Sequence, residues 1–287
     1  MTGTILGIEG GGTKTVALLA NAAGKIVSRR QFGSLNLKLA SDRQILAILR
    51  KFKPTAAAIC LAGCRTPVDR TRLNRLARRV WPTAKLFVGN DLDSGLAAGF
   101  GLTQPGILVI SGTGSVVVGR NAAGTLARAG GWGHLLGDHA SGYWIALTGL
   151  RAAIRDLDRT GQRGAALRCL LRRLELRSPE QLVEWVAGAS KAEVAEHADI
   201  FLRGNRGLLL QAASFLAMDA LAVASKLQLQ APAVALAGGM LRNQPTLRQW
   251  VAHRIHQTLP GAKVKLLRSD SAEGALQLAL NVRNHDR

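Results

Sequence analysis

One pattern that occurs twice constrains the fold most: ILGIEGGGTKTVALL near the N-terminus and ILVISGTGSVVVG from Ile107 onward. Each copy has an apolar run, a turn of small residues and a second apolar run, which is typical of a β-hairpin. Glycines let the backbone approach a ligand, and the hydroxyls of Thr13, Thr113 and Ser115 add donors, so each turn can hold phosphate oxygens. A plain tight turn is the alternative for the first copy taken alone. We interpret the repeat as two phosphate-facing hairpins, one in each of two domains.

The order of elements predicts an α/β protein with a mixed sheet. Three expected strands in a meander are followed by helix, strand, helix and strand: 4–8, 16–20, 26–32, 42–52, 55–62, 67–80 and 85–88. The sequence Gln104-Pro105-Gly106 is the expected hinge. We therefore expect an N-terminal α/β domain over residues 1–104 and a C-terminal one over residues 105–287. For the last expected helix, 272–280, packing on the N-terminal domain is an alternative.

The second half is expected to be helical from Ile145 to about Leu229, with breaks near 177–179 and 204–205. A strand over 234–237, a helix that includes 247–256 and a strand over 263–267 follow. The turn Gly238-Gly239 between that strand and that helix suits a nucleotide base or ribose lying on exposed backbone. A simple helix entry is the alternative.

Carboxylates are scarce in the first half, and four of the six between residues 1 and 150 lie in or beside glycine-rich turns. Asp91 and Asp93 follow an expected strand, where ligands of open α/β sheets gather, although either residue can also serve as a helix cap. Glu9 precedes the first glycine turn and is a candidate to hold a hydrated magnesium ion. Asp138 follows Gly137 and is expected to open an amphipathic helix at an acidic first turn.

Two further polar positions point to the acceptor of the phosphate. Trp132 stands between glycines, so its indole is expected to be exposed near the Asp138 carboxylate. Such a pair suits a polar, ring-shaped molecule. Asn36, in the break GSLN, is either a turn residue or a ligand for a sugar hydroxyl.

The composition is that of a globular protein, with 47% hydrophobic residues and a formal net charge of +20. Such a charge can mean nucleic acid, but the basic residues are scattered with few aromatics among them, so we expect an arginine-rich solvated surface instead. Cys60, Cys64 and Cys169 lack metal spacing and are expected to be free thiols, and the six histidines lack zinc spacing. Without a signal-peptide pattern or an apolar run long enough to span a membrane, the expected location is the cytoplasm.

Four turns together resemble a known family: GIEGGGTKT, NDLDSG, ISGTGS with GGWGHLLGD, and LAGGMLRN. In this order they resemble the N-acetylglucosamine kinase branch of the BadF/BadG/BcrA/BcrD ATPases, within the actin, hsp70 and hexokinase superfamily. The resemblance covers nearly the whole chain. It implies two ribonuclease-H-like α/β domains with mixed sheets, a nucleotide cleft between them, and often a dimer. It also implies ATP-dependent phosphorylation of the 6-hydroxyl of an amino sugar, N-acetyl-D-glucosamine first, with glucosamine or N-acetylmuramate as alternative acceptors.

The resemblance also implies roles for individual residues. Those expected to bind ATP are Gly11, Gly12, Thr13 and Thr113 at the phosphates and Ala198, Gly238 and Gly239 at the adenosine, with Glu9 orienting Mg2+. Those expected at the sugar are Asn36, Asp91, Gly114, Trp132 and Asp138, with Gly63 beside them. Asp91 takes the position of the catalytic base, and Asp93 becomes a capping or supporting group.

One departure from the family pattern concerns the acceptor. Relatives commonly contain GDEGS, whereas this chain has Gly137-Asp138-His139-Ala140-Ser141, one carboxylate fewer beside the expected sugar. Two rival functions belong to other classes. An ATPase that activates an iron–sulfur dehydratase or reductase needs cluster cysteines from each of two subunits, which Cys60 and Cys64 do not match. A sugar or nucleotide sensor without turnover is the other rival.

Overall fold

The computed structural model describes residues 3–284, and the chain divides into two compact units. The first unit contains the chain through Gly106, the short segment Ala122–Gly124 and the chain from Leu267 onward. The second contains Ile107–Asn121 and Thr125–Leu266. The helical end of the chain thus belongs to the same unit as its beginning.

The first unit is built on a five-stranded sheet in the order β3-β2-β1-β4-β5. The strands are β1 (Ile5–Gly10), β2 (Lys14–Ala20), β3 (Ile26–Gly33), β4 (Ala56–Leu61) and β5 (Lys85–Gly89). β1 is antiparallel to β2 and parallel to β4, and β4 is parallel to β5, so the predicted mixed sheet is confirmed. In register, Glu9 lies opposite Cys60, which lies opposite Gly89. The carboxyl ends of β1, β4 and β5 therefore meet at one edge of the sheet.

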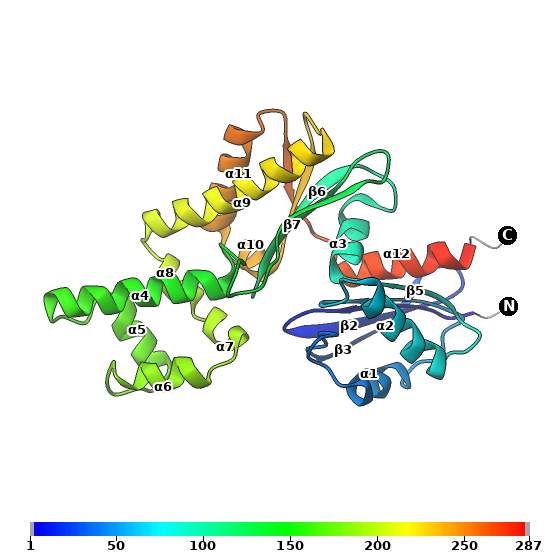
Figure 1. Cartoon of the computed structure of the whole chain (residues 1–287), viewed down its shortest axis with the longest axis horizontal. Coiled ribbons are helices and arrows are strands. Elements are labelled where there is room, and N and C mark those ends of the chain that lie inside the picture. The colour runs from blue at the N-terminus through cyan, green and yellow to red at the C-terminus, as the bar shows by residue number, and fades with distance from the viewer. Residues whose placement is uncertain (1–2, 285–287) are drawn as a thin grey trace. The chain divides into compact units, whose positions relative to one another are not determined.

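Helices cover both faces of this sheet, as Figure 1 shows. α1 (Asp42–Leu49) and α2 (Pro67–Val80) lie on one face, and α3 (Asp91–Phe100) and α12 (Ser271–Asn284) lie on the other. Side chains alternate between two cores along β1, because successive residues of a strand point to opposite faces. Leu6 and Ile8 pack toward the α1 and α2 side, and Ile5 packs toward α12.

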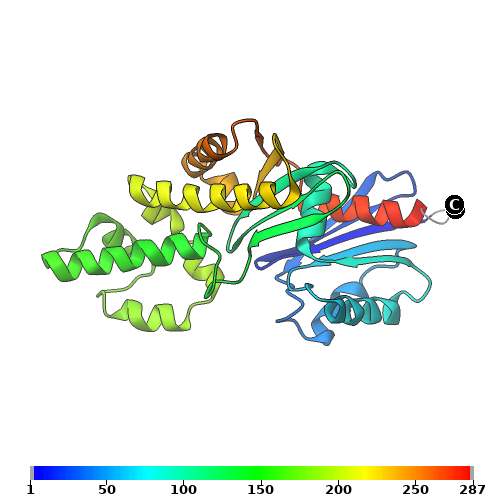
Figure 2. The same cartoon turned by 45° about the horizontal axis from the view of Figure 1, so that its top comes forward.

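Small residues bring α12 close to its neighbours. A Cβ added at Gly7 of β1 would collide with the backbone of Leu276, and one added at Gly274 would collide with the carbonyl oxygen of Ser94 in α3. In Figure 2, α12 (red) lies along the strands of the first unit. Backbone-to-backbone packing of this kind leaves no room for a larger side chain at either glycine.

The second unit has a five-stranded sheet in the order β10-β9-β6-β7-β8. The strands are β6 (Gly106–Ser111), β7 (Ser115–Arg120), β8 (Leu126–Gly130), β9 (Ala233–Ala237) and β10 (Lys263–Leu266). β9 is parallel to β6 and β10, whereas β7 and β8 are antiparallel. The apolar runs of the second hairpin thus form β6 and β7, as predicted.

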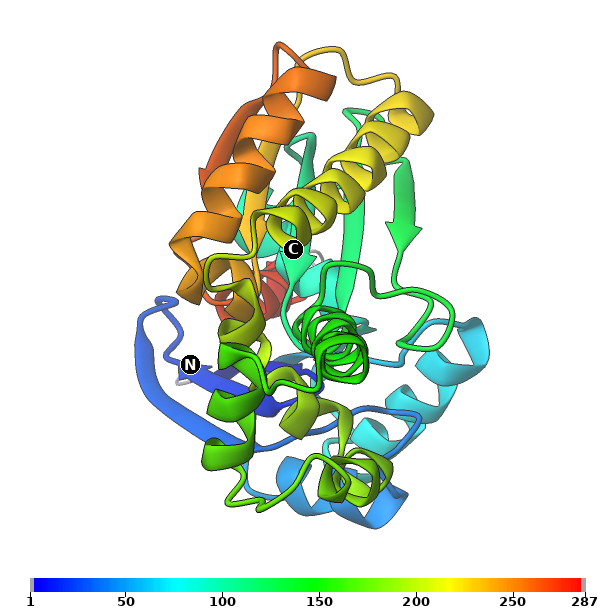
Figure 3. The same ribbon diagram turned by 90° about the vertical axis from the view of Figure 1, so that its left-hand side faces the viewer.

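The second unit also contains most of the helices. They are α4 (Gly142–Thr160), α5 (Ala165–Arg173), α6 (Gln181–Gly188), α7 (Lys191–Ala195), α8 (Ala198–Leu202), α9 (Arg206–Leu227), α10 (Gly239–Asn243) and α11 (Pro245–Thr258). α9 packs on β7 and β8 and runs beside α11, as Figure 3 shows, while α4 packs on α5, α7 and α8. By length and composition α9 could cross a membrane, but 50% of its most apolar window is buried inside the fold. A core helix of a folded domain has the same properties.

Two element predictions are wrong. Asp138 does not open α4, because that helix starts at Gly142 with Ser141 as its N-cap, whose Oγ accepts from the N–H of Trp144 at 3.1 Å. Asp138 lies in the preceding turn with a left-handed φ of 55°. The small residues after Asp93 predict a helix over 96–100, but α3 starts at Asp91, because Asn90 and Asp93 form a capping box there.

Candidate active site

Three predicted residues of the first unit lie at or just after the carboxyl ends of parallel strands of one sheet. Glu9 is near the end of β1, Gly63 follows β4, and Asp91 follows β5 as the first residue of α3. The glycine turn after Glu9 is closed by a bond from the Gly11 N–H to the Lys14 carbonyl at 2.9 Å. Ligands of α/β sheets collect at such strand ends. We call Glu9, Gly11, Gly12, Thr13, Asn36, Gly63 and Asp91 the first-unit group.

The fold opposes ionisation of the two carboxylates of this group. Burial raises the pKa of Glu9 to about 8, with further raising by Asp91 and Asp270 and an opposing effect of Lys14. Burial also raises the pKa of Asp91 to about 6. Hydrogen bonds from backbone N–H groups and the charge of Arg65 hold the pKa of Asp91 down, while Asp93 raises it. A cation placed beside Glu9 would relieve this repulsion.

The structure separates the roles of the two neighbouring aspartates. Asn90 accepts from the N–H of Asp93 at 2.9 Å, and Asp93 accepts from the N–H of Asn90 at 2.9 Å. Arg70 also lies 3.4 Å from the Asp93 carboxylate. The helix cap is therefore made by Asn90 and Asp93. Capping does not explain why a carboxylate stands at position 91.

Asn36 is a turn residue that also faces Gly63. Its Oδ1 accepts from the N–H of Lys38 at 2.9 Å, and its backbone bridges to Ala62 just after β4. A Cβ added at Gly63 would collide with the same Oδ1. Because Oδ1 serves the turn, the amide NH2 is the part of Asn36 that can donate to a ligand.

Three segments of the second unit are tied together around the second glycine turn. The N–H of Gly142 donates to the carbonyl of Gly112 at 2.7 Å. The hydroxyls of Ser111 and Ser115 donate to the carbonyls of Ala140 and His139, each at 2.6 Å. These bonds hold the loop that contains Asp138 against the turn that contains Thr113 and Gly114.

The predicted adenosine turn lies against the same hairpin. Gly238 has a φ of 92°, a conformation that favours glycine, and a Cβ there would collide with the carbonyl of Ser111. A Cβ on Gly112 would lie 3.5 Å from the backbone nitrogen of Gly239. Two turns that are far apart in sequence, and that we predicted to bind one nucleotide, are thus neighbours in space.

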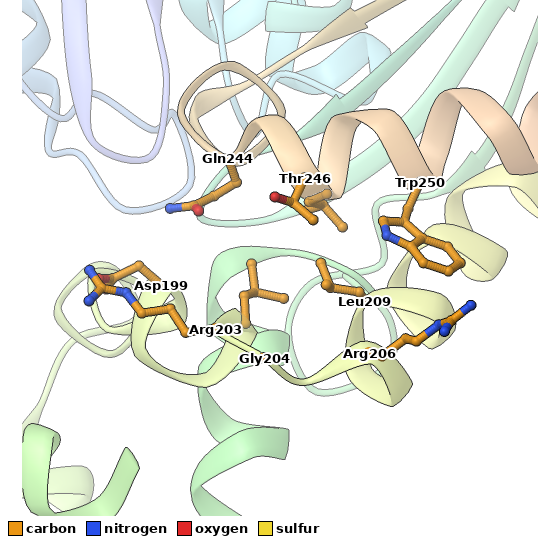
Figure 4. Close-up of a pocket in the computed structure, with 10 residues that line it drawn as sticks. Asp199, Arg203, Gly204, Arg206, Leu209, Gln244, Thr246 and Trp250 are labelled. Atoms are coloured by element: carbon orange, nitrogen blue, oxygen red, sulfur yellow. The ribbon is translucent and has the colours of Figure 1, made fainter. Parts of the chain in front are cut away.

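A cavity of about 450 Å³ opens between α11 and the segment that joins α8 to α9, shown in Figure 4. Its lining includes Asp199, Arg203, Arg206, Gln244, Thr246 and Trp250. Gln244 directly follows α10, which starts at Gly239, and Asp199 directly follows Ala198. Ala198 itself is only 1% exposed and is not among the lining residues. The cavity thus adjoins both predicted adenosine segments, although Ala198 does not face it.

Among the predicted sugar residues of this unit, Gly114 lies against the Asp138 carboxylate, and Trp132 lies against Gly137, the neighbour of Asp138. Asp138 has a side chain that is only 6% exposed, and its Oδ2 lies 2.5 Å from the Nζ of Lys191. Trp132 is 63% exposed, as expected, and the Arg128 guanidinium lies 4.8 Å from its ring centroid. We call Thr113, Gly114, Trp132, Asp138, Ala198, Gly238 and Gly239 the second-unit group. Lys191 is the residue that sequence analysis missed, because it stands 53 positions from Asp138 in a helical segment without a motif.

The two cysteines of the first unit are buried thiols. Cys60 and Cys64 are fully buried, and burial raises the pKa of the Cys60 thiol well above its usual range and that of Cys64 to about 11. His139 stacks on Phe215 with ring centroids 4.5 Å apart. Within residues 3–284, no cluster of three or more His, Cys, Asp or Glu side chains has a metal-binding arrangement.

Comparisons with known proteins show which family the chain matches. The profile of the BadF/BadG/BcrA/BcrD ATPase family matches residues 6–279. An N-acetylmuramic acid/N-acetylglucosamine kinase of Clostridium acetobutylicum is 30% identical, over 96% of this chain and 97% of the relative. An N-acetyl-D-glucosamine kinase of Dictyostelium discoideum is 28% identical over the same shares.

Solved structures give the same picture of the fold. A Chromobacterium violaceum protein provisionally named an N-acetylglucosamine kinase superposes with a TM-score of 0.77 at 26% identity, covering 97% of this chain and 99% of its own. A ROK family glucokinase of Streptomyces griseus superposes with a TM-score of 0.63 at 16% identity, covering 98% and 99%. The second likeness concerns the fold alone, and it confirms the predicted class of two-domain sugar-kinase fold.

Proposed function

Since the chain belongs to the BadF/BadG/BcrA/BcrD ATPase family, we propose that it is an ATP-dependent kinase of an amino sugar. The acceptor is N-acetyl-D-glucosamine first, with N-acetylmuramate or glucosamine as alternatives, and the product is the 6-phosphate. The observation that carries this proposal is the position of Asp91. It follows a parallel strand beside Glu9, has a pKa raised to about 6, and is not needed for the helix cap.

Asp91 is the general base of the proposed reaction. As the sugar 6-oxygen attacks the γ-phosphorus, a new O–P bond forms and the bond from the γ-phosphorus to the β–γ bridging oxygen breaks, which releases ADP. The proton of the 6-hydroxyl passes to the Asp91 carboxylate. A pKa near 6 keeps this carboxylate mostly ionised at neutral pH while leaving it more basic than an ordinary aspartate.

Glu9 is the residue that would hold Mg2+. Its half-buried carboxylate faces the repulsion of Asp91 and Asp270, so the local charge suits a divalent cation, and oxygen is the ligand atom that Mg2+ prefers. When bound, Mg2+ neutralises charge on the transferring phosphoryl group. Gly11, Gly12 and Thr13 beside it present the backbone and hydroxyl donors for phosphate oxygens.

The second-unit group supplies the remaining contacts to the nucleotide and to the sugar. The turn around Thr113 and the turn Gly238-Gly239 bind phosphate and adenosine, and the adjoining cavity has room for a base. Gly114, Trp132 and Asp138 are the residues of this unit that we assign to the sugar, and in the first-unit group Asn36 is assigned to the sugar through its amide donor. The exposed indole gives an apolar surface for the pyranose ring, and the carboxylate of Asp138 accepts from hydroxyls.

Neither rival class has comparable support. An activator of an iron–sulfur enzyme needs cysteines that are accessible to a shared cluster, whereas Cys60 and Cys64 are buried in the first unit. A sensor without turnover does not need a carboxylate of raised pKa at the position of Asp91. We further propose that the enzyme works in the cytoplasm, as a homodimer on a small-molecule sugar and without nucleic acid.

The decisive experiment is ADP release with ATP, Mg2+ and a panel of amino sugars. We expect N-acetyl-D-glucosamine to be turned over, and Asp91→Asn to lower kcat by about a thousandfold because the base is lost. Asp93→Asn is the matched control, since an asparagine oxygen can still accept at the cap. Full turnover by Asp91→Asn would show that the base is elsewhere, and ATP hydrolysis by a brown, iron-containing protein would favour the activator.

A further inference from the structure

We propose that Lys191 belongs to the sugar site and adapts it to amino sugars that carry a carboxylate; this inference rests on the proposed kinase function. Lys191 is the first residue of α7, and the N-cap Ser190 and Glu193 form a capping box at that position. α7 packs against α4, which follows the Asp138 loop in sequence. The ammonium is thus held on a helix that the core of the second unit fixes in place.

The ion pair combines a buried acid with an accessible base. The Lys191 Nζ lies 2.5 Å from the Asp138 Oδ2, and the two side chains are 30% and 6% exposed, respectively. An ammonium has three N–H donors, and the bond to Asp138 uses one of them. The other two donors can reach a ligand, because part of the side chain remains open to solvent.

The pair lies directly against the predicted sugar turn. A Cβ built on Gly114 would be 2.8 Å from the Asp138 Oδ2 and 3.0 Å from the Lys191 Nζ. Gly114 and Asp138 are two of the residues that we assign to the sugar, so any molecule that contacts both also meets the ammonium. Lys191 therefore shares their ligand and does more than support the fold.

The charge at this place explains which acceptor fits. The residue after Asp138 is a histidine, so the loop carries no second carboxylate. The His139 ring stacks on Phe215 and lies edge-on to Trp144. Asp138 and Lys191 sum to a neutral pair. An acceptor with its own carboxylate is therefore not repelled here, and the free donors of Lys191 can bind it.

The neutral Asp138–Lys191 pair and the free donors of Lys191 predict one class of acceptor, an N-acetylhexosamine with an acidic ether substituent. N-acetylmuramate is such a sugar, because it is N-acetylglucosamine with a lactyl group on one hydroxyl. The alternative is that Lys191 only orients Asp138. In that case its loss would affect neutral and acidic sugars to the same extent.

The test is the ratio of kcat/KM for N-acetylmuramate to kcat/KM for N-acetylglucosamine, measured by ADP release. The wild type should turn over both sugars. Lys191→Met should lower the ratio about tenfold, and Lys191→Arg should keep it within about threefold, since arginine retains the charge. Lys263→Met removes one exposed lysine of the same unit from β10 and should leave the ratio unchanged.

A second measurement needs no variant. Raising the ionic strength should raise the KM for N-acetylmuramate more than the KM for N-acetylglucosamine, because salt screens the attraction between Lys191 and a carboxylate. An equal loss for both sugars in Lys191→Met, a wild type that rejects N-acetylmuramate, or a salt effect shared by both sugars would overturn the inference. Absence of turnover with either sugar would instead overturn the proposed function.

Discussion

Asp91 is the residue whose ionisation should set the pH range of the reaction. Only the carboxylate can accept the hydroxyl proton, and burial raises the pKa of Asp91 to about 6. We expect kcat/KM for the sugar, at saturating ATP, to rise about tenfold per pH unit below that value and to level off above it. Arg65→Gln should move the midpoint upward, because the charge of Arg65 lowers this pKa. A profile that is flat across the range around pH 6 would contradict the assignment.

Glu9 should make the folded protein less stable at alkaline pH when no metal is present. Its pKa rises from 4.5 to about 8 on folding, so the folded state prefers the protonated form. Stability is therefore full below the unfolded pKa and falls as the pH rises toward about 8. Glu9→Gln keeps the shape without the charge and should raise Tm by a few degrees near pH 9, with little change near pH 4.

Thermal unfolding in chelator across that pH range measures the effect, and the same variant should lose activity with Mg2+. Glu184→Gln, on α6, is a control that removes a carboxylate of the second unit. A Tm difference that is the same at both pH values would show that the charge of Glu9 is not the cause.

At the scale of elements, Asp69 joins the start of α2 to the Asn36 turn. It accepts from the N–H groups of Thr66 at 2.9 Å and Arg65 at 3.0 Å, and it forms an ion pair with Lys38. The ion pair with Lys38 and these backbone bonds hold the pKa of Asp69 far below its usual range. The N–H of Lys38 in turn donates to the Asn36 side chain.

Asp69→Ala should therefore lower the free energy of unfolding by about 2 kcal/mol at neutral pH, because two part-buried backbone N–H groups and the Lys38 ammonium lose a charged acceptor. The difference should shrink as the pH falls below about 4, where the unfolded Asp69 is protonated and the wild type loses this contribution. We also expect a higher KM for the sugar. Urea unfolding at several pH values is the measurement. Asp156→Ala, which removes an exposed ion pair with Arg159, should change stability by less than about 0.5 kcal/mol.

Elements whose signals are local could be predicted from the sequence, and elements that depend on distant partners could not. The helix predicted over residues 67–80 is confirmed, because Thr66, Pro67 and Asp69 together specify its start. β8 was not predicted, since LARAG has a weak apolar pattern and becomes a strand by pairing with β7. The start of α4 was misplaced because Asp138 bonds to Lys191 instead of capping a helix.

For the candidate site, glycine turns and strand ends carried the prediction. Glu9, Asp91 and Gly238 could be proposed from the sequence because each adjoins a strand end that the apolar pattern marks. Lys191 has no such marker, and its role follows only from contacts that the fold creates. Ala198 was placed by resemblance alone, and its burial leaves Asp199 as the neighbour that faces the cavity.

At the scale of the whole molecule, α12 ties the last part of the described chain to the first sheet. Gly274→Val should destabilise the first unit by about 2–3 kcal/mol, because the added carbons would collide with the Ser94 carbonyl and push α12 away from α3. Calorimetry should show a fall in Tm of about 5–10 °C. Gly188→Val, at the end of α6 where a Cβ meets open space, should have a much smaller effect. Equal effects of the two variants would mean that α12 is not closely packed.

The return of α12 also determines the order in which the polypeptide can mature on a ribosome. The sheet that contains Ile5 and Val16 is synthesised first, yet the helix that shields this face emerges after all of the second unit. During most of translation an apolar surface thus stays open to chaperones or to unwanted association. A chain truncated after Leu266 would lack α12, so the sheet of the first unit, which is synthesised first, would keep an apolar face uncovered.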